Sequence, residues 1–233
     1  MRKIFNITTK TADYMSIVTT HKCQLNCPFC VDLHEKNDEE INIESVTNAL
    51  AFAKAKGIRD ILLVGGEPTL HSKIVQIAEC VKSNGFKCIL TTNYQRPDVI
   101  RRLDGIVDCF NISYYGQHEL PKQKWFKSDI TLSALIYKNR FSGKEDFDRF
   151  IDTYQKNMHL KFSTLSPCNE WAAYHQKVDW LDDLPFEWTG VLFDEILGHV
   201  YRGCIIKRYD RVINPNAAQS YKCLVDGTIA KHW

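Results

Sequence analysis

Three cysteines stand close together near the start of the chain, with the spacing Cys-x3-Cys-x2-Cys: Cys23, Cys27 and Cys30. Soft thiolate ligands favour iron–sulfur clusters or zinc. Because a structural zinc site takes four protein ligands, three thiols leave one coordination position open, which is what reaction chemistry requires. His21 or His34 could instead supply a fourth ligand. These residues alone therefore leave both a reactive cluster and a structural zinc site open.

A second motif, Gly65-Gly66-Glu67-Pro68, directly follows the apolar run 60–64. Two glycines at the end of a buried strand let the backbone approach a ligand closely and expose its carbonyl groups. The proline then directs the chain away from the sheet. Taken alone, an ordinary strand-to-helix turn explains this motif, but beside the cysteine segment it indicates a second wall of one site.

These motifs are carried by short apolar runs that alternate with helical periodicity. We predict strands at 14–20, 60–64, 86–92, 107–115, 129–137 and 159–165, and helices at 43–53, 74–81, 97–103 and 145–157. About six β/α repeats predict an α/β fold in which a parallel sheet forms a partial (β/α)6 barrel, like an incomplete TIM barrel.

The regular alternation weakens after Pro167, and four of the five tryptophans lie beyond it. We therefore predict a barrel core over residues 1–166 and a C-terminal extension over 167–233 that covers the substrate. Within the extension, the Asp226-Gly227 pair between apolar residues predicts a β-hairpin.

Polar residues at two further strand ends are candidates for the same site. Thr92 and Asn93 end the third predicted strand, and Ser113 lies late in the fourth. Ligands of parallel α/β proteins bind at the carboxyl ends of the strands. We expect these side chains to face a ligand, although capping the strand ends would explain them equally well.

The composition excludes some classes of function. The net charge is +2 and no run of Lys or Arg exceeds a pair, so the chain lacks the basic footprint of a protein that binds long nucleic acids. No segment is long and apolar enough to span a membrane, and the first residues do not resemble a signal peptide. We expect a cytoplasmic protein, whose nine cysteines are poor disulfide candidates.

The cysteine spacing, with Phe29 just before the last cysteine, resembles the signature of the radical S-adenosylmethionine (radical SAM) superfamily. The resemblance implies that Cys23, Cys27 and Cys30 bind three irons of a [4Fe–4S] cluster, and that S-adenosylmethionine chelates the fourth. The position of the signature after the first predicted strand also resembles the family.

Gly65-Gly66-Glu67-Pro68 is similar to the Gly-Gly-Glu motif of the same family. The resemblance implies that this backbone hydrogen-bonds the methionyl ammonium group, while the glutamate helps to shape the site. It also implies that Phe29, Asn93 and Ser113 contribute to cofactor binding, the last two by position only.

The activity implied by the resemblance is reductive cleavage of S-adenosylmethionine to a 5′-deoxyadenosyl radical, which takes a hydrogen atom from a substrate. The electron would come from a donor such as flavodoxin or ferredoxin. The substrate is expected to be a peptide or a small metabolite, with a nucleotide or a sugar as the alternative. A non-catalytic iron–sulfur or zinc protein is the alternative from another class, but a passive site has no use for a methionyl-binding turn.

The six remaining cysteines fall into two groups. Cys80, Cys88 and Cys109 lie on predicted helices and strands, and we interpret them as small core residues. Cys168, Cys204 and Cys223 all lie in the extension.

Many family members carry auxiliary clusters in SPASM or twitch extensions, where a glycine precedes a cysteine ligand by five positions. Here Gly227 precedes His232 at that offset, so the tail departs from the pattern. One auxiliary cluster on Cys168, Cys204, Cys223 and His232 is one expectation. A plain hairpin that closes the barrel is the other.

Overall fold

A computed structural model describes residues 14–31, 37–116, 120–192, 196–212 and 220–231. Within them one sheet runs in the order β11-β10-β1-β2-β3-β4-β5-β6-β9-β8-β7. The strands are β1 (Tyr14–Val18), β2 (Asp60–Val64), β3 (Lys87–Thr92), β4 (Cys109–Tyr114), β5 (Asp129–Ile136), β6 (His159–Thr164), β7 (Trp188–Leu192), β8 (Ile196–Tyr201), β9 (Cys204–Val212), β10 (Tyr221–Cys223) and β11 (Ile229–Ala230).

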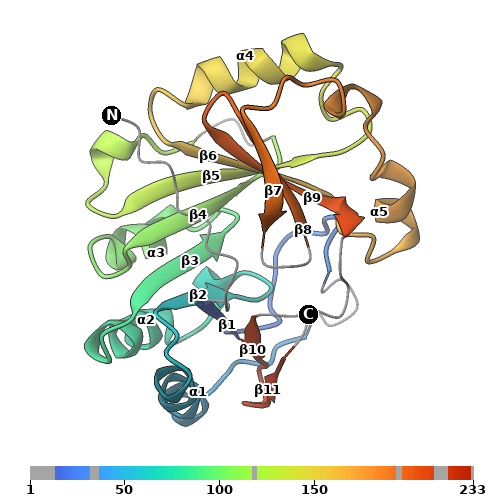
Figure 1. The fold of residues 1–233 in the computed structure, drawn as a ribbon. Coiled ribbons are helices and arrows are strands. Elements are labelled where there is room, and N and C mark those ends of the chain that lie inside the picture. Colours follow the sequence, from blue (N-terminus) through green and yellow to red (C-terminus); the bar gives the residue numbers. More distant parts are fainter. Residues whose placement is uncertain (1–13, 32–36, 117–119, 193–195, 213–219, 232–233) are drawn as a thin grey trace.

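Strands β1 to β6 pair in parallel and in chain order, and Figure 1 shows them curving with the helices on the outer side. The helices are α1 (Ile43–Ala55), α2 (Ile74–Ser83), α3 (Pro97–Leu103), α4 (Lys144–Tyr154) and α5 (Glu170–His175), and the short 3-10 turns are η1 (Pro68–Leu70), η2 (Gln123–Trp125) and η3 (Asp179–Leu181). The predicted α/β fold, a partial TIM-like barrel, is confirmed.

The core lies between the barrel and its helices. On β5, for example, Ile130, Leu132, Ala134 and Ile136 are fully buried, whereas the residues between them are only half-buried. Successive side chains of a strand point to opposite faces, so the apolar set packs under the helices and the alternate set faces the barrel interior. The inward-facing positions are therefore the ones available to a ligand.

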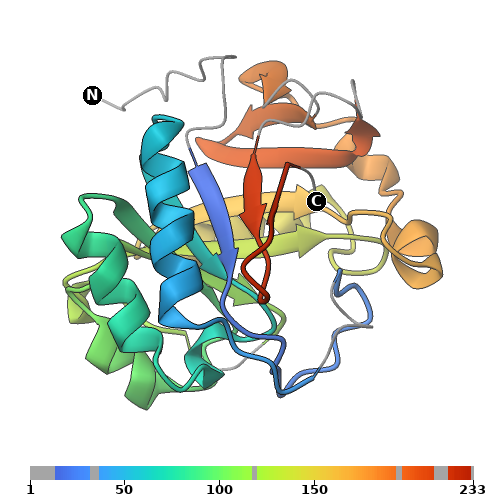
Figure 2. The same cartoon turned by 90° about the horizontal axis from the view of Figure 1, so that it is seen from below.

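The chain beyond residue 166 extends both edges of this sheet. Strand β9 pairs in parallel with β6 and carries the antiparallel strands β8 and β7. Strand β10 pairs in parallel with β1 and forms the expected hairpin with β11, which Figure 2 shows beside the blue first strand. The β/α alternation stops after β6, as predicted, but the strands beyond it are paired with distant barrel strands, which the sequence did not show. The domain boundary at 166 stays a prediction.

Two smaller expectations also need correction. Strand β1 ends at Val18, two residues earlier than predicted, because Thr19 and Thr20 turn toward the segment around Glu40. Of the three cysteines predicted in the core, only Cys88 is buried, and burial raises the pKa of its thiol to about 12. Cys80 and Cys109 are half-buried. None of the described helices is long and apolar enough to cross a membrane.

Candidate active site

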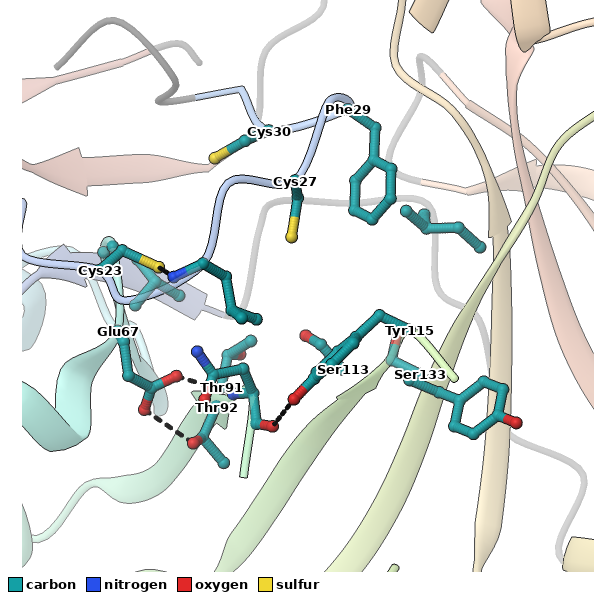
Figure 3. Close-up of a pocket in the computed structure, with 17 residues that line it drawn as sticks. Cys23, Cys27, Phe29, Cys30, Glu67, Thr91, Thr92, Ser113, Tyr115 and Ser133 are labelled. Atoms are coloured by element: carbon teal, nitrogen blue, oxygen red, sulfur yellow. Dashed lines mark hydrogen bonds between the residues drawn. The ribbon is translucent and has the colours of Figure 1, made fainter. Parts of the chain in front are cut away.

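A pocket of about 240 Å³ lies between the cysteine loop and the carboxyl ends of strands β2 to β5 (Figure 3). Its walls comprise Cys23, Leu25, Cys27, Phe29, Cys30, Val64, Gly65, Gly66, Glu67, Thr91, Thr92, Asn93, Ser113, Tyr114, Tyr115, Ser133 and Leu135. The structure thus brings together every residue that we predicted for the site except Pro68, which is buried at the first position of η1.

The three motif cysteines lie on the loop that forms one side of this pocket (Figure 3). All three are half-buried, so a ligand in the pocket can reach them from inside the barrel. The Leu25 N–H donates to Cys23 Sγ at 3.5 Å, and the Cys30 N–H donates to the Cys27 carbonyl at 3.1 Å. This donor set, three thiols at the mouth of a pocket, fits a cluster that keeps one position for a ligand.

The predicted zinc alternative needs a fourth ligand from His21 or His34. His34 lies outside the described residues, and His21 Nδ1 lies 3.4 Å from the Glu39 carboxylate. Among the residues that the structure describes, no three His, Cys, Asp or Glu side chains are grouped closely enough to hold a single metal ion.

Close packing of the backbone requires a glycine at both position 65 and position 66. A Cβ on Gly66 would lie 2.3 Å from the Lys22 carbonyl oxygen, and one on Gly65 would lie 2.4 Å from that of Thr20. The Gly66 N–H donates to the Thr20 carbonyl at 2.8 Å, and the Glu67 N–H donates to the Lys22 carbonyl at 2.7 Å. We expected the glycines to admit a ligand. They line the pocket, but their small size also lets the base of the cysteine loop dock onto the end of β2.

Glu67 is buried, with 1 % of its surface exposed, and its carboxylate accepts four hydrogen bonds. Oε1 receives the Thr69 N–H at 3.1 Å, the Thr69 hydroxyl at 2.6 Å and the Thr92 hydroxyl at 2.7 Å. Oε2 receives the Asn93 N–H at 2.7 Å. The glutamate therefore joins η1 to the end of β3, and the Thr92 hydroxyl, which we expected to face a ligand, is used in this network.

Asn93 links the strand ends to the cysteine loop. Its side-chain oxygen accepts from Gln24 Nε2 at 3.2 Å and from the Gln95 N–H at 3.1 Å. The Tyr115 hydroxyl in turn donates to the Asn93 carbonyl at 3.3 Å. Sequence reasoning missed Tyr115, although it was the last residue of the predicted strand 107–115, because it singled out only Ser113 near that strand end.

Ser113 lies at an inward position of β4, in register with Ser133 of β5, and both serines line the pocket. Thr91, an inward residue of β3 in register with Asn111 of β4, also lines the pocket. Sequence reasoning missed Thr91 and Ser133 because it took single residues near the ends of two strands and did not extend the choice to the other inward positions. The alternation of side chains between the two faces of a strand was the signal that could have marked them.

The other side of the cysteine loop packs against the segment that follows β6. Phe29 lies 6.1 Å from the ring of Trp171, and Asn169 Nδ2 donates to the Pro28 carbonyl at 3.0 Å. Cys168 Sγ contacts the Phe29 and Cys30 carbonyls, each at 3.8 Å. Residues 168–171 therefore help to hold the loop over the pocket.

The cysteines proposed for an auxiliary cluster do not come together. Strand β9 is parallel to β6 and strand β10 is parallel to β1. Cys204 is the first residue of β9 and Cys223 the last of β10, so the two thiols lie at opposite ends of the barrel. Burial raises the pKa of the Cys223 thiol to about 11, which disfavours the thiolate that a metal binds. His232, the fourth expected ligand, lies outside the described residues.

Curated proteins with similar sequences share part of this chain. A GTP 3′,8-cyclase of Chlorobaculum tepidum is 32% identical over 104 residues, 43% of this chain and 31% of that protein. A probable GTP 3′,8-cyclase of Methanothermobacter marburgensis is 37% identical over 81 residues, 34% of this chain and 27% of that protein. An S-adenosylmethionine-dependent nucleotide dehydratase of a Thermoplasmatales archaeon is 34% identical over 95 residues, 40% of this chain and 34% of that protein. The matches therefore span about a third of each relative's length.

Solved structures share the fold. SuiB of Streptococcus suis, bound to its precursor peptide SuiA, superposes with a TM-score of 0.63 at 16% identity and covers 97% of this chain and 60% of SuiB. The sequence profile of the Radical SAM superfamily matches residues 17–165, more than half of the chain, from within β1 to the end of β6. The chain belongs to the radical SAM superfamily.

Proposed function

We propose that this protein is a radical SAM enzyme whose Cys23, Cys27 and Cys30 hold one [4Fe–4S] cluster beside S-adenosylmethionine in the described pocket. The family implies both groups. The observation that carries the assignment to these residues is the pocket itself, which is walled by the cysteine loop on one side and by Gly65 and Gly66 on the other. When bound and given one electron by a reductant, the cluster and S-adenosylmethionine would supply a 5′-deoxyadenosyl radical able to take a hydrogen atom from the substrate.

The residues around the pocket would position these groups. The turn at Gly65 and Gly66 fixes the base of the cysteine loop through two backbone hydrogen bonds. Because the Glu67 carboxylate already accepts four hydrogen bonds from the chain, it acts as a positioning residue. Phe29 and Leu135 supply apolar wall, which limits access of water to a reactive intermediate.

Iron content and spectroscopy test this function directly. Purified without oxygen, the protein should be brown and bind about four irons per chain. The triple variant Cys23→Ala, Cys27→Ala and Cys30→Ala should lose them. With a chemical reductant and S-adenosylmethionine, the wild type should release 5′-deoxyadenosine and the triple variant should not.

The matched control is Cys80→Ala, which removes a half-buried thiol of α2 outside the pocket and should keep both iron and turnover. A colourless wild-type protein loaded with zinc would contradict the proposal. About eight irons per chain would contradict the assignment of a single cluster.

For the substrate we propose a nucleotide in preference to a peptide. The relatives at 32–37% identity are named for GTP and for nucleotides, whereas the peptide-bound SuiB is 16% identical and bears on the fold alone. The assay is consumption of GTP and CTP beside a peptide library, with 5′-deoxyadenosine release as the common readout. Faster release with peptides than with either nucleotide would favour the peptide. A cytoplasmic location and a flavodoxin or ferredoxin donor remain predictions.

A further inference from the structure

The barrel interior below the pocket is lined by polar side chains. Inward positions on strands β4 to β6 hold Asn111, Ser113, Thr131, Ser133, Lys161 and Ser163. A TIM-type barrel interior is ordinarily filled by branched apolar side chains. These side chains are half-buried and lose part of their contact with water, which costs free energy unless they find partners, so this lining calls for an explanation.

Lys161 lies in the same row of inward residues as two serines that line the pocket. On β6 it is in register with Ser133 of β5, which is in register with Ser113 of β4. Residues in register share a face, and their Cβ atoms lie about 5 Å apart. Both serines line the pocket, whereas Lys161 is not one of its lining residues. A flexible stem of four carbons would let its amine approach an anion held by the serines.

The amine of Lys161 lacks an anionic partner in the described part of the chain. Burial lowers the pKa of this amine, and only the Cys109 thiol opposes that effect. Acidic residues at inward positions of β1 to β6 are confined to the first residues of β2 and β5, Asp60 and Asp129, at the end of the barrel opposite the pocket.

Another buried cation of the described chain is paired. Arg208 of β9 is 2 % exposed, and its guanidinium lies 2.9 Å from the Asp182 carboxylate. A buried charge normally has such a partner, because an unpaired one is costly. Lys161 differs from Arg208 because it has no carboxylate beside it in the described chain. Its amine is therefore available to an anion that enters from the pocket.

Two polar atoms without hydrogen-bond partners lie in the same interior, a hydroxyl that can donate and an amide oxygen that takes a donor such as water. Asn111 is two residues before Ser113 on the same face of β4, and its amide Nδ2 donates to the Thr91 hydroxyl at 3.3 Å. Asn111 Oδ1 and Ser16 Oγ are buried and have no hydrogen-bond partner among the described residues. Buried polar atoms without a partner are rare in folded proteins and indicate a place for a ligand or water.

We propose that Lys161 binds an oxyanion of the substrate, a phosphate or a carboxylate, inside the barrel, with Ser113 and Ser133 donating hydrogen bonds to it. The inference rests on the proposed function, and it makes Lys161 the residue that selects anionic substrates over neutral ones. Lysine binds phosphate as a compact point charge, and hydroxyl donors complete such a site.

Calorimetric titration of the reconstituted holoenzyme with S-adenosylmethionine tests the proposal. The probes are inorganic pyrophosphate and GTP for a phosphate, succinate for a carboxylate, and guanosine as the neutral partner of GTP. At least one anionic probe should bind the wild type. Lys161→Met and Lys161→Gln should lower the affinity for that probe by about 10- to 100-fold, which corresponds to the loss of one charged hydrogen bond. The affinity for guanosine should not rise. Lys87→Met, at the exposed start of β3, should bind like the wild type.

Thermal unfolding of the ligand-free protein separates binding from a structural role. Because Lys161→Met replaces an unpaired buried amine by an apolar side chain of similar length, it should raise the melting temperature. A lower melting temperature with unchanged probe binding would assign Lys161 to structure and overturn the proposal. Failure of the wild type to bind any anionic probe would also overturn it. The proposed function is tested separately, by release of 5′-deoxyadenosine from the wild type without a probe.

Discussion

The rim of the barrel and its interior treat polar side chains in opposite ways. At the rim, the Glu67 carboxylate and Asn93 exchange hydrogen bonds with neighbouring residues of the chain. In the interior, Lys161 has no anionic partner in the described chain, and Ser16 Oγ and Asn111 Oδ1 have no hydrogen-bond partner there. Polar groups that satisfy one another build a framework, whereas polar groups without partners are available to a ligand. A substitution at the rim should therefore lower the free energy of unfolding, and a substitution in the interior should change it little.

The largest effect is expected at Gly66. Gly66→Ala places a Cβ 2.3 Å from the Lys22 carbonyl oxygen, which forces the base of the cysteine loop away from β2. We expect a loss of about 3 kcal/mol in the free energy of unfolding, the upper part of the range for overpacking. We also expect iron content to fall. Denaturant unfolding and an iron assay measure the two effects.

Gly143→Ala is the matched control for that variant, because the nearest atom to its new Cβ is the end of the Glu145 side chain at 3.6 Å. Equal stability of the two variants would show that the loop base has room to move.

The second effect is expected at Glu67. Glu67→Gln replaces an acceptor oxygen by an amide donor that faces donors, so at least one buried hydrogen bond is lost. A loss of about 2 kcal/mol is expected in the unfolding free energy, because unsatisfied buried donors carry their full desolvation cost. Glu79→Gln, on the exposed face of α2, should change stability by less than about 0.5 kcal/mol. An unfolding free energy that is the same in Glu67→Gln and in the wild type would show that the hydrogen bonds of Glu67 do not stabilise the rim.

A smaller effect, dependent on pH, is expected at Glu40. Burial alone would raise the pKa of Glu40, but hydrogen bonds from Ser72 and Lys22 outweigh it and hold the pKa at about 2. Because the folded pKa lies below the unfolded value, the carboxylate stabilises the protein above about pH 4.5 and loses that contribution as the pH falls toward 2.

The difference in unfolding free energy between wild type and Glu40→Gln should therefore be about 1 kcal/mol at pH 7 and shrink below about pH 4.5. Urea titrations at several pH values measure it. A difference that stays constant down to about pH 3 would exclude the charged contacts of Glu40 as its cause.

The smallest effect is expected in the interior. Ser16→Ala removes a buried hydroxyl that has no partner in the described chain, so the unfolding free energy should stay the same or rise by up to about 1 kcal/mol. Thr20→Val is the comparison at the rim, since the Thr20 hydroxyl donates to the Glu39 carbonyl at 2.7 Å. If Ser16→Ala were the more destabilising of the two, the contrast between rim and interior would be wrong.

Local patterns predicted the parallel strands and the pocket residues that belong to the two motifs, because strand periodicity and the cysteine and glycine motifs are written in contiguous residues. They did not show that the carbonyls of Thr20 and Lys22 fill the space beside Gly65 and Gly66. That contact joins segments that are far apart in the sequence. The same limit explains why Lys161 escaped notice, since its importance depends on Ser133 lying beside it in the sheet.

The pairing of β10 with β1 has a consequence for synthesis. Met15 is in register with Tyr221, which the ribosome adds about 200 residues later. Because synthesis proceeds at about 5–20 residues per second, the outer edge of β1 stays unpaired for roughly 10–40 s before β10 is made. An open strand edge can pair with other chains during that interval. Ribosome-bound chains halted before Tyr221 should therefore depend on chaperones more strongly than chains that extend past the hairpin.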